Sequence, residues 1–190
     1  MAQRLTRQFY LQPALRVAKK LLGKYLVHQI GSKKIIGKIV ETEAYPGPQD
    51  LASHAQHNKI TSRNLAEYMI GGHIYIYLVY GMYWQLNIST GLSGRPECVL
   101  IRAVEPTKTT HAPTPSTNGP GKLCNYLKIN QRHYGSDLVT SREIWLEPGE
   151  KVSAKNIVAA KRIGIDYAGP YWTNKKWRFY LKNTPYVSKS

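Results

Sequence analysis

The sequence has 190 residues, which is enough for one compact domain with a sizeable core and too few for two ordinary domains. Its 27 lysines and arginines exceed its 11 aspartates and glutamates, so the formal charge is +16 at pH 7. This balance favours a polyanionic partner, although a protein that is merely basic, such as a ribosomal or halotolerant one, stays an alternative at this point.

Hydropathy and cysteine content exclude several classes of protein. No stretch approaches the roughly 20 consecutive apolar residues that a membrane span requires. The first 15 residues are interrupted by charges, unlike a secretory signal. Cys98 and Cys124 are too few for a disulfide framework or a four-ligand zinc site by themselves. We therefore expect a protein of a reducing cytoplasm that has no membrane association.

The first elements that the pattern predicts are a helix and a β-hairpin. Apolar side chains recur at helical spacing after Pro13, and Gly23 supplies a stop. Residues 24–29 and 34–42 are rich in β-branched side chains and flank a short turn, which predicts two strands. The second strand would deliver Glu43 at its exit.

The middle of the chain predicts a polar loop followed by three strands. Residues 46–72 are turn-rich and contain a short helical stretch at 64–69. Residues 74–80, 84–89 and 97–104 have the composition of strands and are joined by short turns. Strands that follow one another so closely pair mostly in the antiparallel sense.

The last third of the chain predicts a loop, a helix and three further strands. Residues 106–121 hold four prolines and are expected to form an exposed loop, not a linker between domains. A helix is expected over 121–127, and strands over 143–146, 158–165 and 177–181.

Glu41 and Glu43 are the acidic residues that most need an explanation. Strand alternation places them on the same side, directly after an apolar run, in a chain with only 11 acidic residues. A surface that binds nucleic acid would avoid such carboxylates, whereas an enzyme that must activate water would accept them. The alternative is structural: both would pair with Lys or Arg on a neighbouring strand.

Two histidines in the polar loop admit two interpretations. His54 and His57 have the spacing of two metal ligands on one helical face, but no third and fourth donor is evident, and we predict no metal. A histidine that follows a candidate catalytic carboxylate would instead donate a hydrogen bond to a ligand.

Aromatic residues are concentrated between positions 75 and 84. Core packing is the ordinary role of Tyr75 and Trp84. The chain has 14 tyrosines and only two phenylalanines, so many rings should keep one edge in contact with water. Aromatic faces beside a basic surface suit stacking on unpaired bases, at about 1–3 kcal/mol for each stack. A tyrosine displayed before Gly81 would also suit insertion into a base stack.

Together these segments resemble the alkyladenine (3-methyladenine) DNA glycosylase family. The resemblance runs in order over nearly the whole chain. It is carried by residues 39–45, Gly47-Pro48, His54, Arg63-Asn64, 75–83, 87–89, 99–103, Glu105-Pro106, 119–124, 162–164 and 178–180.

The resemblance implies roles for individual residues. Glu43 would be the general base that activates the water attacking C1′ of the flipped nucleotide, and Arg102 and the backbone carbonyl of Ile163 would help to hold that water. Tyr45 and Tyr77 would sandwich the extruded base.

Further roles follow from the same resemblance. His54 would donate a hydrogen bond to the edge of the base, and Asn87 would reject normal guanine by a clash with its exocyclic amine. Contacts with the DNA would come from Tyr80, which would enter the gap left in the duplex, and from Met82, Arg63 and Lys122.

The resemblance also implies the overall fold and activity. The fold would be a single α+β domain over residues 1–190, with a curved and mostly antiparallel sheet flanked by helices. The protein would act as a monomer on double-stranded DNA and, without a cofactor, would release 3-methyladenine, 7-methylguanine, hypoxanthine or ethenoadenine. No lysine occupies the matching base position, so a lyase step is not expected. The rival interpretations are a non-catalytic nucleic-acid-binding module and a nuclease or RNA-modifying enzyme.

Overall fold

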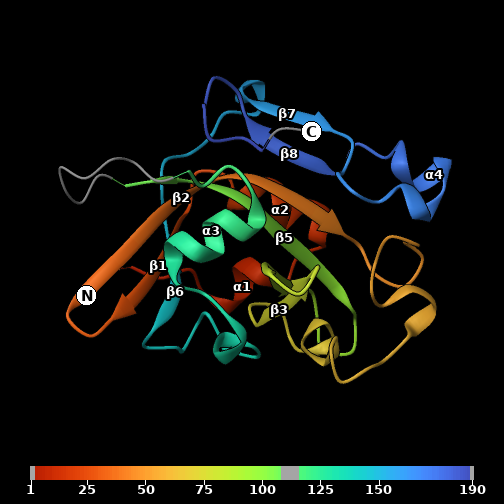
Figure 1. Cartoon of the computed structure of the whole chain (residues 1–190), viewed down its shortest axis with the longest axis horizontal. Helices are drawn as coiled ribbons and strands as arrows, with labels where there is room; N and C mark the ends of the chain where they lie inside the picture. The colour runs from red at the N-terminus through yellow and green to blue at the C-terminus, as the bar shows by residue number, and fades with distance from the viewer. Residues whose placement is uncertain (1–2, 108–115, 189–190) are drawn as a thin grey trace.

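An eight-stranded antiparallel sheet organises the chain (Figure 1). The computed structural model describes residues 3–107 and 116–188. The strands run in the order β3-β4-β5-β2-β1-β6, and β8 pairs with both β2 and β7. All pairings between these strands are antiparallel, and helices pack against the sheet. The predicted α+β fold with a mostly antiparallel sheet is confirmed.

The predicted helix and hairpin at the start of the chain are present, and the second strand is longer than expected. Helix α2 (Ala14–Leu21) has Pro13 as its N-cap. Strands β1 (Tyr25–Ile30) and β2 (Lys33–Tyr45) form the hairpin. Glu43 therefore lies inside β2, not at its exit as predicted. The strand continues because its second half is paired on both edges, with β5 and with β8.

The three strands predicted in the middle of the chain are confirmed within two residues at each end. They are β3 (Ile74–Val79), β4 (Tyr83–Thr90) and β5 (Glu97–Pro106). The turn between β3 and β4 places Tyr80 and Gly81 at φ values of 52° and 69°. Two consecutive positive φ values are typical of the tight turns that fit the twist of a hairpin.

The C-terminal part differs most from the sequence-based expectation. Strands β6 (Ile144–Glu147) and β8 (Arg178–Leu181) lie within one residue of the expected ranges. The strand predicted over 158–165 is wrong in its second half, because β7 (Ile157–Ala160) ends five residues earlier. After Ala160 the chain leaves the sheet to make side-chain and backbone contacts with the end of β2.

Helix α3 (Pro120–Leu127) begins one residue before the predicted start. Of the predicted loop over 106–121, residues 108–115 lie outside the described residues. The short helical stretch expected at 64–69 is the 3₁₀ helix η2 (Leu65–Tyr68). The sequence did not predict the other short helices, which are α1 (Arg7–Tyr10), η1 (Gln56–Asn58), η3 (Gln131–His133), η4 (Ala154–Asn156), η5 (Asp166–Ala168) and α4 (Pro170–Thr173).

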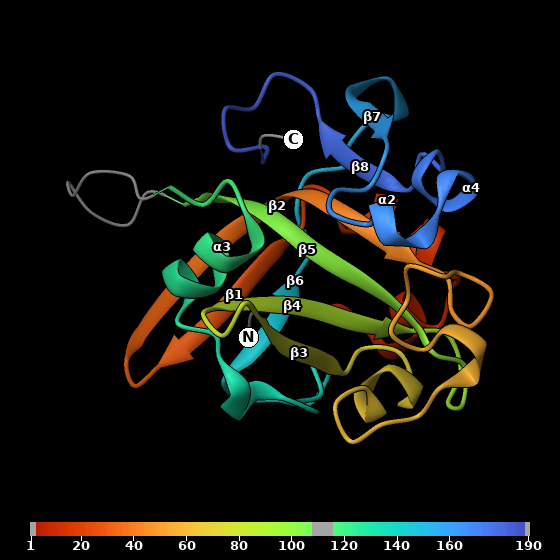
Figure 2. The same cartoon turned by 45° about the vertical axis from the view of Figure 1, so that its right-hand side comes forward.

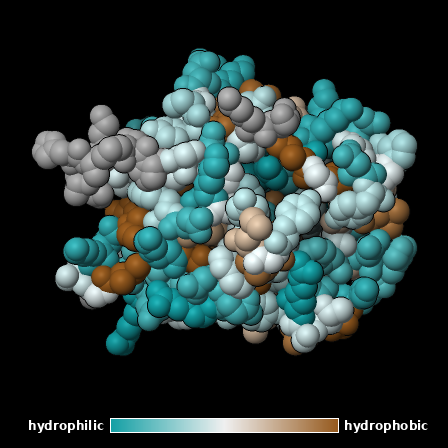
Figure 3. Space-filling model, viewed as in Figure 1, coloured by the Kyte–Doolittle hydropathy of each residue, from teal (hydrophilic) through white to brown (hydrophobic). Residues whose placement is uncertain are grey.

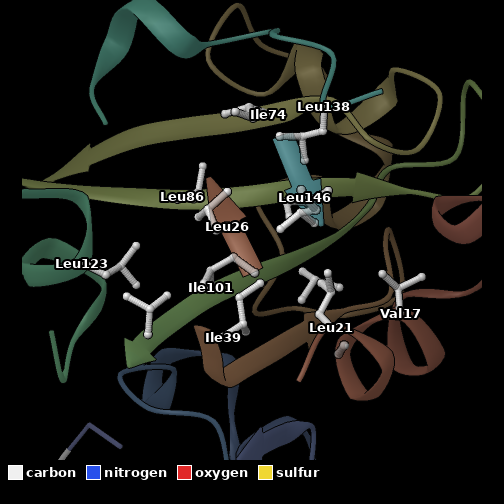
Figure 4. Close-up of a cluster of buried hydrophobic side chains, with 14 of the residues drawn as sticks. Val17, Leu21, Leu26, Ile39, Ile74, Leu86, Ile101, Leu123, Leu138 and Leu146 are labelled. Atoms are coloured by element: carbon white, nitrogen blue, oxygen red, sulfur yellow. The ribbon is translucent and has the colours of Figure 1, made fainter. Parts of the chain in front are cut away.

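One apolar core joins the helices to the sheet (Figure 4). Its fully buried side chains come from α2, from the strands and from α3, and include Val17, Leu21, Leu26, Ile39, Ile74, Leu86, Ile101, Leu123 and Leu146. The face shown in Figure 3 is mostly hydrophilic, with hydrophobic side chains in small separate patches. Within the described part of the chain, no helix has the length and apolar character needed to cross a bilayer.

Two loop regions from distant parts of the sequence meet at one end of the sheet (Figure 2). One is the segment that follows β2, and the other lies between β7 and α4. They are joined by the ion pair between Asp50 and Arg162 and by a hydrogen bond of 3.1 Å from the Tyr167 hydroxyl to the Ala52 carbonyl. Ala52 and Tyr167 of this junction form part of the wall of a cavity.

Candidate active site

A cavity of about 620 Å³ opens beside the end of β2. Its wall combines side chains from β2, the following loop, β3, β4, β5, the start of α3 and the segment after β7. Nine of the sequence-predicted site residues line it: Tyr45, His54, Arg63, Tyr77, Tyr80, Asn87, Arg102, Lys122 and Ile163. The fold therefore gathers residues that lie more than 100 positions apart in the sequence, such as Tyr45 and Ile163.

Glu43 lies directly behind this wall and is fully buried. Its Oε1 accepts a hydrogen bond of 2.9 Å from the backbone N–H of Ile163 and lies 3.3 Å from Nη1 of Arg102. Its Oε2 accepts a hydrogen bond of 2.9 Å from the Tyr45 hydroxyl. All three partners line the cavity, whereas Glu43 itself does not. Ile163 contacts Glu43 through its backbone N–H. That its carbonyl helps to hold the attacking water stays a prediction.

Glu41 has the structural role that the sequence left open for both acidic residues. Its Oε1 accepts hydrogen bonds from Arg178 at 2.9 Å and from the Ser188 hydroxyl at 2.8 Å, and its Oε2 accepts one from the Ser188 N–H at 2.7 Å. Arg102 Nε lies 3.4 Å from the same Oε1. These donors occupy the acceptor positions of the Glu41 carboxylate, and Glu41 does not line the cavity. Of the two acidic residues, Glu43 remains the catalytic candidate.

The buried ion pair between Asp50 and Arg162 holds the cavity wall next to Glu43. Both side chains are inaccessible to solvent. Arg162 also donates to the Ala44 carbonyl at 3.1 Å, and its guanidinium lies 4.6 Å above the ring of Tyr45. The pair thus fixes Ile163 against Glu43. Sequence reasoning missed Asp50, because an acidic residue in a polar loop carries no signal of burial.

Three aromatic or imidazole rings form one side of the cavity. His54 and Tyr77 meet edge to face with their centroids 4.6 Å apart. His54 Nδ1 lies 2.6 Å from the Tyr75 hydroxyl. Burial, aided by the charge of Arg63, lowers the pKa of His54 to about 4, and burial raises the pKa of Tyr75. The imidazole is therefore neutral at pH 7. In the tautomer that carries its proton on Nε2, Nδ1 accepts a hydrogen bond from the Tyr75 hydroxyl.

Asn87 is buried in the wall of the same cavity with a fixed orientation. Its amide nitrogen donates to the backbone carbonyls of Tyr75 and Gln85, both at 3.2 Å. Its Oδ1 lies 3.9 Å from the Cys98 thiol. Because the amide cannot turn over without losing both donor contacts, Asn87 presents a defined polar edge.

The four predicted DNA-contact residues divide between the cavity and the open surface. Tyr80 is 86% exposed at the tip of the β3–β4 turn and also lines the cavity. Arg63 lies with its guanidinium 4.7 Å above the ring of Tyr77, and Lys122 donates to Asn118 at 2.9 Å. Met82 is 63% exposed and does not line the cavity. Two cations and a projecting tyrosine therefore stand at the cavity.

His57 does not join His54 in the structure. It is exposed on η1 with φ 55°, while the imidazole of His54 contacts Tyr75 and Tyr77. Across residues 3–107 and 116–188, no three side chains of the His, Cys, Asp or Glu type are grouped as metal ligands would be.

Comparison with known proteins identifies the class of protein to which the chain belongs. A family model described as Methylpurine-DNA glycosylase (MPG) matches residues 8–185. The chain is thus a DNA glycosylase, a hydrolase that binds DNA and acts in DNA repair. More particularly, the chain belongs to the methylpurine-DNA glycosylase family, which confirms the resemblance found in the sequence.

Relatives in distant organisms match over almost their whole length. A protein of Natranaerobius thermophilus named as a 3-methyladenine DNA glycosylase is 42% identical over 196 residues, which cover 97% of this chain and 98% of the relative. Proteins named in the same way in Borreliella burgdorferi and Methanocella arvoryzae are each 44% identical. These matches cover 97% of this chain and 100% and 96% of the two relatives.

Proposed function

We propose that this enzyme removes alkylated and deaminated purines from duplex DNA by hydrolysis, with the damaged base swung out of the helix into the cavity and Glu43 as the general base. The observation that carries this proposal is the position of Glu43 behind the cavity, in contact with Tyr45, Arg102 and Ile163. Substrates would be the 3-methyladenine, 7-methylguanine, hypoxanthine and ethenoadenine class. The relatives named as 3-methyladenine DNA glycosylases support this substrate class.

The contacts of Glu43 leave one acceptor position of its carboxylate unused. An ionised carboxylate offers about four acceptor positions. Three are used, by the N–H of Ile163, the guanidinium of Arg102 and the hydroxyl of Tyr45. A water that donates to the fourth position would be oriented by a rigidly held base. Loss of its proton to Glu43 as it attacks C1′ is general base catalysis.

The same carboxylate would stabilise the reacting sugar. As the bond between C1′ and the purine breaks, the electron pair leaves with the base and positive charge develops on the sugar. A negative charge that is already fixed beside this centre stabilises the transition state without reorganisation of solvent. The burial of Glu43 strengthens this effect, because screening by water is weak there.

The cavity wall suits a purine that has left the base stack. Flipping costs a few kcal/mol and costs least for damaged bases, whose pairing is already weakened. Tyr45 and Tyr77 would offer aromatic faces, which favour a purine that alkylation has made cationic. Nε2–H of His54 would donate to the base edge, and Asn87 would reject the exocyclic amine of guanine. Since one chain supplies all these groups, we also propose that it acts as a monomer.

Replacing Tyr80 with glycine is expected to slow excision from duplex DNA by about ten- to a hundredfold, because the side chain would fill the gap that the flipped base leaves. Glycine accepts the positive φ of this turn, so the backbone should not change. The measurement is the single-turnover rate on one lesion in a duplex and in a single strand. The rate on the single strand should stay within about threefold of the wild-type rate. Equal losses on both substrates would contradict an inserting role.

Product analysis tests the proposed function as a whole. Duplexes that each carry one lesion should yield a free base and an abasic site, with the strand intact until alkali is added. Borohydride should trap no covalent complex, because water is the nucleophile and no lysine forms a Schiff base. EDTA should leave the rate unchanged, since the carboxylate activates water without a metal. Strand cleavage before alkali would point to a nuclease, and the absence of base release from every lesion would overturn the proposal.

A further inference from the structure

Glu67 is a second buried carboxyl group at the cavity, and the mechanism above does not use it. It lies on η2, lines the cavity and is 2% exposed. Its Oε1 accepts a hydrogen bond from the Cys98 thiol at 3.2 Å. Its Oε2 has no hydrogen-bond partner anywhere in the part of the chain that the structure describes. A buried polar atom without a partner is unfavourable, so a ligand that supplied one would gain binding energy.

The neighbours of Glu67 belong to the part of the cavity that would receive the base. Cys98 contacts both Glu67 and Asn87. Cys98 also lies in the small core cluster against which Tyr45 and Tyr77 pack. Through Cys98, Glu67 is therefore linked to Asn87 and to the cluster against which the two tyrosines pack. Under the proposed function, a group at this place would contact the flipped purine.

The charge of Glu67 depends on pH near neutrality. Burial raises the pKa of this carboxyl from 4.5 to about 7, while the Cys98 thiol, the nearby Asn64 amide and the charge of Arg63 act in the opposite direction. Because the pKa is raised, the neutral acid dominates below pH 7 and the carboxylate above it. Arg63 is the charged group near Glu67. The other titratable groups around it are Tyr68, Tyr75, Tyr77, Cys98 and Tyr134.

We infer that Glu67 is a base-contacting residue that selects purine lesions by their charge: its neutral form donates a hydrogen bond to a neutral purine, and its carboxylate favours a purine that carries a positive charge. The inference rests on the proposed function. When the bond to C1′ breaks, a neutral base takes the electron pair and becomes negative, and a hydrogen bond from Oε2 would stabilise that charge. A cationic base becomes neutral on leaving and needs no donor, whereas its ground state gains from a nearby anion.

The test is the ratio of two excision rates as a function of pH. Single-turnover rates are measured on matched duplexes that carry 3-methyladenine, which is cationic, or hypoxanthine, which is neutral. A group that acts equally on both substrates cancels in their ratio. Between pH 6 and pH 8 the protonated fraction of an acid with a pKa of about 7 falls about tenfold. The ratio of the 3-methyladenine rate to the hypoxanthine rate should rise by about that factor.

Three variants separate this inference from other causes. Glu67→Gln keeps a neutral donor at every pH and should hold the ratio constant within about twofold. Cys98→Ala removes a hydrogen-bond donor to the carboxylate, so the midpoint of the rise in the rate ratio should move to higher pH. This variant provides a second test if E67Q does not fold. Glu105→Gln, the same change at the ion pair with Lys38 outside the cavity, should keep the wild-type curve.

The outcomes separate the inference from the proposed function. A flat wild-type ratio, or an E67Q ratio that still rises with pH, overturns the role of Glu67 while base release itself still supports the glycosylase mechanism. If the wild type releases neither base, the proposed function fails and the inference falls with it.

Discussion

Replacing Glu43 with glutamine is expected to lower the single-turnover rate of base release by at least about a thousandfold. Glutamine keeps the size of the side chain but loses its charge and its basicity, so both water activation and stabilisation of the sugar cation are removed. Each effect is typically worth a factor of about 10² to 10⁴. Binding of a lesion-containing duplex should persist, because the cavity wall and the surface cations are unchanged. The measurements are the excision rate and a binding titration on the same duplex.

Glu41→Gln is the matched control for this prediction. The same chemical change two residues away removes a charge that Arg178 and Ser188 hold outside the cavity. We expect Glu41→Gln to lower the stability of the fold. The variant protein that does fold should release the damaged base at a rate within about tenfold of the wild-type rate. If E43Q released base at the wild-type rate, or if E41Q lost as much rate as E43Q while folded, Glu43 would not be the general base.

Removing the carboxylate of Asp50 is expected to lower the free energy of unfolding by about 3–5 kcal/mol, because Arg162 would remain buried without its counter-charge. This is a large part of the 5–15 kcal/mol that typically stabilises a domain. The measurement is urea unfolding of Asp50→Ala, followed by the fluorescence of the four tryptophans. Excision should fall as well, because Arg162 positions Ile163 against Glu43.

Two further variants check the cause of this loss. Glu105→Gln breaks the partly exposed ion pair with Lys38 and should cost no more than about 1 kcal/mol. The double variant Asp50→Leu with Arg162→Met replaces both charges with apolar groups and should recover part of the stability that D50A loses. A loss below 1 kcal/mol in D50A would show that the pair does not hold the two segments together.

Much of the sheet follows from local pattern. The hairpin of β1 and β2 and the run of β3, β4 and β5 were predictable, because alternation and short turns are local properties of the chain. The residues at which β2 and β7 end could not be predicted in this way. Both depend on pairing or contacts with segments more than 100 residues away in the sequence.

For the site, the sequence by itself determined the family, and hence the glycosylase activity, because a resemblance that runs along nearly the whole chain identifies both. It also pointed to Glu43 and the tyrosines. Only the tertiary structure determined which donors surround Glu41 and which surround Glu43, because strand alternation places both on one side and the donors come from distant segments. The burial of Asp50 and Glu67 was also evident only in the tertiary structure, because the environment of such an acidic residue depends on what packs over it.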